Sequence, residues 1–127
     1  MDNLTLLYIC GFYNILLTFF HILFWRIFKW ETTLDKGTKA NKAIIQIINN
    51  QLIYLFAIMA MVYLLFPTAL LNSKLGNVIL MGYAGFWIVR FIQQFLFLKQ
   101  KGKFVIALSF LFFFGAVIHL LPILLNK

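Results

Sequence analysis

Acidic residues are scarce in this sequence, and their shortage excludes several kinds of chemistry. Three of the 127 residues are Asp or Glu, and these residues, Asp2, Glu31 and Asp35, lie outside the long apolar runs. Metal ions in proteins are held mainly by carboxylate, His and Cys ligands, and proton relays in membranes commonly use carboxylates. We therefore expect neither a metal site nor carboxylate-based proton coupling in the apolar part of the chain.

Cysteine is scarcer still, and the motifs of soluble enzymes are absent. The single cysteine, Cys10, lies in an apolar run and cannot form a disulfide within the chain. The sequence contains no glycine-rich phosphate loop, no nucleophile elbow and no HExxH zinc motif. We therefore expect no cofactor, and the sequence favours a non-enzymatic role over catalysis.

Hydrophobic residues are abundant, at 64% of the chain, whereas charged residues make up 11%. Soluble domains contain about 45–50% apolar and about 25% charged residues. Four apolar runs, residues 4–28, 44–66, 75–98 and 104–125, each reach the roughly 20 residues that cross a membrane of about 30 Å. The expected fold is all-α, an integral membrane four-helix bundle with antiparallel up-down-up-down order, forming a single transmembrane domain over residues 1–127.

Turn residues separate these runs. Pro67 is expected to end the second run, and the next turn is expected at Asn72, Ser73 and Gly76. The turn around Gly102 is so short that the last two helices should be antiparallel neighbours. The first run is too long for a signal-peptide core and no Lys or Arg precedes it, so a cleaved signal peptide is not expected.

The positive charges predict an orientation. The formal net charge is +8, but the cations gather in two short loops beside apolar runs, so we expect contact with lipid headgroups rather than nucleic acid. These loops and their flanks contain Arg26, Lys29, Lys36, Lys39, Lys42, Lys99, Lys101 and Lys103. The opposite side has Lys74 and Lys127. By the positive-inside rule both basic loops are cytoplasmic, and both termini of this multi-pass protein are non-cytoplasmic.

Polar residues recur at helical spacing within three of the runs and define a candidate ligand site. The three stripes are Asn14, Thr18, His21 and Trp25; Gln46, Asn49, Asn50 and Tyr54; and Tyr83, Trp87, Arg90 and Gln94. Polar groups avoid lipid, so the stripes should face the bundle interior. Thr18 is the weakest member, because its hydroxyl can bond a carbonyl of its own helix. The candidate ligand-binding residues are Arg90, His21, Asn14, Gln46, Asn49, Asn50, Gln94 and Trp87.

Arg90 is the most informative of these residues, because no carboxylate lies within any of the four runs. A charged side chain costs at least about 2.5 kcal/mol at the centre of a membrane helix. Three interpretations remain open. Arg90 can extend to the inner interface, it can be held as a structural cation by Asn49, Asn50, His21 and carbonyls, or it can bind an anionic ligand or lipid headgroup with Gln94.

Two classes of function follow from these observations. In the first, the chain binds or transports an anionic or amphipathic small molecule or a lipid at an inner-leaflet site around Arg90. In the second, the chain is a structural or accessory subunit whose amides join helices. Short loops and small residues in the last two runs favour a homo-oligomer or a membrane partner protein in either case. His119, in the outer half of the last run, is expected to serve in helix packing.

The runs FHILFWRIFKW (Phe20 to Trp30), NKAIIQIINNQLIY (Asn41 to Tyr54) and FWIVRFIQQFLF (Phe86 to Phe97) resemble a family of small, uncharacterised bacterial four-helix membrane proteins. This resemblance implies a bacterial inner membrane and no particular activity. KANKAIIQIINN and Arg90 are more loosely similar to the MAPEG superfamily of four-helix trimeric enzymes, which would imply a glutathione-dependent activity. That family carries a glutamate in its second-helix motif, and this chain has none there.

Overall fold

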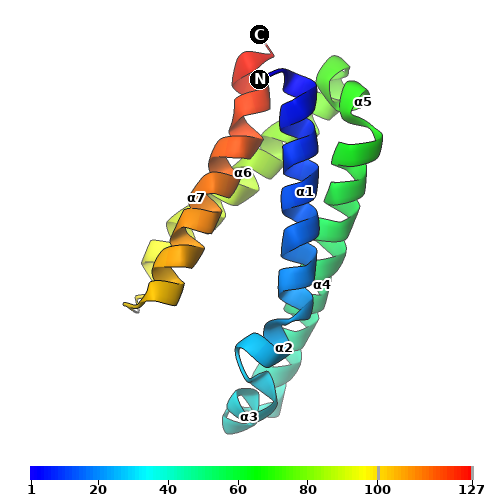
Figure 1. The fold of residues 1–127 in the computed structure, drawn as a ribbon. Coiled ribbons are helices and arrows are strands. Elements are labelled where there is room, and N and C mark those ends of the chain that lie inside the picture. The colour runs from blue at the N-terminus through cyan, green and yellow to red at the C-terminus, as the bar shows by residue number, and fades with distance from the viewer. Residues whose placement is uncertain (100, 127) are drawn as a thin grey trace. The chain divides into compact units, whose positions relative to one another are not determined.

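The structure is a computed structural model that describes residues 1–99 and 101–126, and these residues form helices and no strands. Its four long helices are α1 (Asn3–Ile22), α4 (Lys39–Leu65), α6 (Lys74–Phe97) and α7 (Lys103–Leu125), shown in Figure 1. All four are long and apolar enough to cross a membrane. The expected all-α class is confirmed, and α6 and α7 begin and end within one residue of the expected runs.

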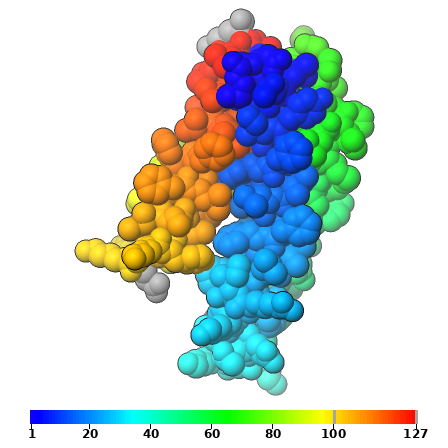
Figure 2. Space-filling model, viewed as in Figure 1, coloured from blue at the N-terminus to red at the C-terminus, as the bar shows by residue number. Residues whose placement is uncertain are grey.

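The first helix differs from its expected run. α1 ends at Ile22, and the run to Phe28 continues instead as a separate short helix, α2 (Phe24–Ile27). Next come the short helix α3 (Trp30–Thr33) and a 3₁₀ turn, η1 (Leu34–Lys36). The expectation of one helix over residues 4–28 is therefore wrong at its C-terminal end. The segment from α2 to η1, cyan in Figures 1 and 2, forms a compact knob after α1.

One backbone reversal and one ion pair shape this knob. Lys29 has φ 51° and ψ 45°, the left-handed conformation, and it turns the chain between α2 and α3. Asp35 forms an ion pair with Lys42 in the first turn of α4. Asp35, one of the three acidic residues of the chain, is therefore paired with a lysine close to it in sequence.

A short helix that the sequence did not predict, α5 (Pro67–Asn72), lies between α4 and α6. Pro67 occupies its first turn, where proline is tolerated because the missing N–H needs no partner. The backbone N–H of Gly76 donates to Ser73 Oγ over 2.8 Å and caps α6, so the expected turn is confirmed at Ser73, whereas Asn72 and Gly76 lie within α5 and α6. A Cβ on Gly76 would lie 2.2 Å from the Leu70 carbonyl oxygen, so glycine permits the close approach of α5 and α6.

The start of α1 is fixed by Asp2. The Thr5 N–H donates to Asp2 Oδ1 over 2.9 Å, as an N-terminal capping residue requires. The Thr5 side chain, first, and its backbone N–H, second, stabilise the ionised carboxylate by hydrogen bonding and lower the pKa of Asp2 below its ordinary value of 3.8.

The chain forms two compact units. Unit 1 comprises Met1–Cys10 and the described residues from Tyr63 onward, and unit 2 comprises Gly11–Val62. In unit 1, α6 and α7 pack as a hairpin in which Gln94 contacts Val105 near the turn and Trp87 contacts His119 farther away. In unit 2, the buried side chains include Leu17, Asn49 and Phe56. Lys127, counted among the charges of the non-cytoplasmic side, lies outside the described residues.

Candidate functional site

The eight candidate site residues divide between the two units. Unit 2 contains Asn14, His21, Gln46, Asn49 and Asn50, and unit 1 contains Trp87, Arg90 and Gln94. Each group is described within its own unit. A single site that includes all eight residues stays a prediction.

In unit 2 the structure brings His21 and Asn49 together. The Asn49 amide Nδ2 donates to the His21 carbonyl oxygen over 3.1 Å. His21 is the penultimate residue of α1, and carbonyls in the last turn of a helix lack partners within that helix. Asn49 thus provides the hydrogen bond that the end of α1 requires. Its own Oδ1 is buried and has no hydrogen-bond partner in the described part of the chain.

The His21 ring is packed among aromatic side chains and is 6% exposed. It stacks on Phe24 with ring centroids 4.1 Å apart, and Phe56 lies edge-on at 4.9 Å. Its Nδ1 lies 3.0 Å from the Leu17 carbonyl oxygen, which requires the proton on Nδ1. This ring therefore contributes chiefly to packing at the end of α1.

The other amides of the first two stripes have different environments. Asn14 is fully buried, Gln46 is half-buried, and Asn50 and Tyr54 are exposed. The expectation that the whole α4 stripe faces the interior is therefore wrong for Asn50 and Tyr54. The Thr18 hydroxyl donates to the Asn14 carbonyl oxygen over 2.8 Å, as expected from their spacing within one helix.

In unit 1 the expected α6 stripe is buried or half-buried along its length. Tyr83, Trp87 and Gln94 are buried, and Arg90 is half-buried. The Arg90 guanidinium carbon lies 4.1 Å from the centroid of the Phe112 ring, a cation–π contact. The sequence does not identify this partner, because Phe112 is far from Arg90 along the chain and no local pattern relates the two residues. The spacing of four residues between Arg90 and Gln94 was the sequence feature indicating that this face of α6 packs against a neighbouring helix.

Gln94 is a buried amide near the α6–α7 turn. Its Nε2 donates to the Val105 carbonyl oxygen over 3.5 Å, a long hydrogen bond. Its Oε1 is buried, with no hydrogen-bond partner among the residues the structure describes. Burying an amide oxygen without a donor is costly, so the Gln94 side chain has capacity for a further hydrogen bond.

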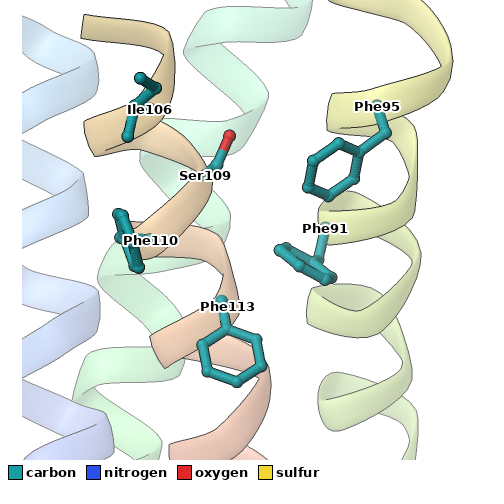
Figure 3. Close-up of a pocket in the computed structure, with 6 residues that line it drawn as sticks. All are labelled: Phe91, Phe95, Ile106, Ser109, Phe110 and Phe113. Atoms are coloured by element: carbon teal, nitrogen blue, oxygen red, sulfur yellow. The ribbon is translucent and has the colours of Figure 1, made fainter. Parts of the chain in front are cut away.

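A groove runs along the same hairpin. One part, of about 310 Å³, is lined by five apolar side chains and one hydroxyl: Phe91, Phe95, Ile106, Ser109, Phe110 and Phe113. Figure 3 shows Phe91 and Phe95 pointing from α6 toward α7, with Ser109 and Phe113 pointing back. A second part, of about 320 Å³, shares Phe95, Ile106 and Ser109 and adds Gln94 and Lys101. The groove is therefore apolar along the helices and basic at the turn.

A buried aromatic cluster around His119 also lies in unit 1. His119 is fully buried, and its ring lies 5.1–5.6 Å from those of Tyr63, Tyr83 and Trp87. Its Nδ1 lies 2.7 Å from the Gly115 carbonyl oxygen. The burial and this contact confirm the expected packing role. Tyr83 and Trp87 were expected on one face of α6, but Tyr63 could not be predicted, because no local pattern relates it to His119.

Comparison of the chain with protein-family models, with curated proteins and with solved structures found no match.

Proposed function

We propose that this chain is a multi-pass membrane protein that binds an anionic amphiphile, such as a phospholipid, on its α6–α7 hairpin. In this proposal the four long helices cross a bacterial inner membrane in antiparallel order, with both basic loops in the cytoplasm. The helices are long and apolar enough for this arrangement. The eight cations of those loops and their flanks, against the two, Lys74 and Lys127, on the opposite side, support the orientation.

The observation that carries the proposal is the groove that runs from Phe113 to Lys101. The groove has apolar walls along most of its length and the cation Lys101 at one end. It therefore complements an anionic lipid, in which an apolar acyl chain is joined to a negatively charged headgroup. The rings of Phe91 and Phe113 lie 5.5 Å apart and provide a wall for an acyl chain. Within a membrane, contacts of this kind stabilise by van der Waals packing rather than by removing apolar surface from water.

The charged end of the groove suits a phosphate. Lys101 lines it, and Lys99 and Lys103 are exposed on either side of the turn. Each lysine near an anionic membrane surface contributes about 1 kcal/mol of attraction. Gln94 Oε1, at the same end, can accept a hydrogen bond from a headgroup hydroxyl or amine.

Arg90 contributes positive charge deeper in the same hairpin. It lies one helical turn before Gln94, and its contact with Phe112 holds the guanidinium against α7. Arg90 is absent from the groove lining, so its role in this proposal is electrostatic attraction rather than direct contact with the chain of the lipid.

Native mass spectrometry of the protein released from mild detergent tests the proposal. The wild type should retain an anionic lipid, and a variant with Lys99, Lys101 and Lys103 changed to Gln should lose it. Arg90→Leu should weaken retention less than the triple change. The matched control is Lys74→Gln, at the opposite end of α6, which should retain lipid as the wild type does. Equal retention in all variants would overturn the proposal.

A further inference from the structure

One face of α4 carries a stripe of side chains that runs along almost the whole helix. Successive members are spaced alternately three and four residues apart: Ile44, Ile47, Gln51, Tyr54, Ile58, Met61 and Leu65. All are exposed except Ile58, which is half-buried. The buried residues Asn49 and Ala60 lie on the opposite face of the helix. Alternating spacings of three and four are the heptad pattern by which pairs of helices pack.

Gln51 distinguishes this stripe from an ordinary lipid-facing surface. Exposed aliphatic side chains need no partner in lipid, but an amide exposed to hydrocarbon lacks hydrogen bonds. Gln51 lies seven residues after Ile44, about 10 Å into the expected apolar run. Gln93 of α6 is also exposed, but it lies only about 6 Å from the helix end at Phe97. Gln51 therefore needs a protein partner more than Gln93 does, and the exposed Asn50 at a similar depth lies outside the stripe.

We infer that this face of α4 binds the same face of a second copy of the chain. The inference rests on the proposal that α4 crosses the membrane. Copies inserted in one orientation pair about an axis normal to the membrane, so the two α4 helices run parallel. Gln51 then faces the partner's Gln51, and each amide can donate to and accept from the other. A single polar residue in a heptad seam also fixes the register of the pair.

The surface of α4 has room for such a neighbour. A hollow of about 440 Å³ lies beside Gln51 and Tyr54, and its other five lining residues are Ile or Leu. Side chains from a parallel helix fill hollows of this kind when seam residues insert between those of the partner. Two such hollows can face each other in a pair of α4 helices, because apolar residues of one copy then meet apolar residues of the other, and Gln51 meets Gln51.

Cysteine cross-linking in native membranes tests the inference. In a Cys10→Ala background, single cysteines replace Ile47, Tyr54 and Met61 on the seam, or Ile45 and Ile53, which belong neither to the seam nor to the lining of the hollow. We expect oxidation to cross-link the three seam positions into dimers and to leave the two control positions monomeric. Absence of dimers at every position, or equal yields at all five, would overturn the inference. Carbonate extraction of the same membranes reports separately whether the chain is inserted.

A second pair of variants tests the role of the amide. Gln51→Leu should weaken dimerisation in lipid vesicles about three- to thirtyfold, the range expected when an interhelical hydrogen bond is lost. Gln93→Leu, which removes an exposed amide from α6, should leave dimerisation unchanged. A Gln51→Leu protein that pairs as strongly as the wild type would contradict the hydrogen-bonded seam, as would equal weakening by both changes.

Discussion

Asn49 of α4 donates a hydrogen bond over 3.1 Å to the carbonyl oxygen of His21, one residue before α1 ends. This bond connects two helices and satisfies a carbonyl in the last turn of α1. It gives a physical reason for the end of α1 at Ile22, since neither proline nor glycine occurs in that part of the apolar run.

The first prediction concerns this bond. Asn49→Ala leaves the His21 carbonyl buried without its donor, so it should lower the free energy of unfolding by about 1–3 kcal/mol. The control is Asn50→Ala, an exposed amide on the next residue, which should change it by less than about 0.5 kcal/mol. Thermal unfolding in detergent, followed by circular dichroism, measures both. Equal effects would show that the bond does not hold the end of α1.

Gly76 and Gly82 of α6 provide a matched pair for a second prediction. A Cβ at Gly76 would lie 2.2 Å from the Leu70 carbonyl oxygen. A Cβ at Gly82 would meet no atom within 4 Å outside its own stretch of helix. Gly76→Ala should therefore destabilise the protein by separating α5 from α6. Gly82→Ala should be neutral or stabilising by up to about 1 kcal/mol, because alanine favours helix. Thermal unfolding that ranks the two variants in the reverse order would contradict the close approach.

A third prediction concerns Arg90 and Phe112. Their contact should give a coupling of about 0.5–2 kcal/mol in a double-mutant cycle of Arg90→Gln and Phe112→Leu, measured by unfolding in detergent. A coupling near zero would mean that the guanidinium does not rest on this ring. The cycle separates a structural role of Arg90 from its effect on lipid retention.

The pH dependence of the α1 N-terminus gives a fourth prediction. Hydrogen bonding by the Thr5 side chain and by its backbone N–H lowers the pKa of Asp2, so the cap stabilises the folded state above the ordinary pKa of 3.8. This contribution is lost as the pH falls through the lowered pKa of the folded state. Hydrogen exchange at the Thr5 amide should accelerate relative to its unfolded reference over that window. Asp2→Asn should abolish the pH dependence, and an unchanged profile in this variant would assign it to another group.

The sequence predicted the bounds of α6 and α7 better than it predicted the end of α1 or the presence of α5. Apolar length and turn residues located α6 and α7 to within one residue, because both features are local. The end of α1 at Ile22 depends on Asn49, which is far away in sequence. Likewise, α5 was missed because Pro67 was interpreted only as an end, although proline also suits the first turn of a helix.

The candidate site was predicted only in part. Helical spacing correctly grouped Trp87, Arg90 and Gln94, because residues three and four apart share a face. It could not distinguish the buried Asn49 from the exposed Asn50, since burial depends on which helix lies opposite. The groove beside Phe91 could not be predicted from the sequence either. Its walls come from two helices, and no local sequence pattern specifies how those helices are rotated relative to each other.

The most direct test of the lipid-binding proposal is photo-cross-linking with a phosphatidylglycerol that carries a diazirine in its acyl chain. The account predicts labelled peptides from α6 and α7 around Phe91, Phe95 and Ile106, and loss of this label in Ser109→Trp, which fills the groove. Val117→Trp, at an exposed position of α7, should keep it. Labelling spread evenly over all four long helices, or unaffected by Ser109→Trp, would contradict the account.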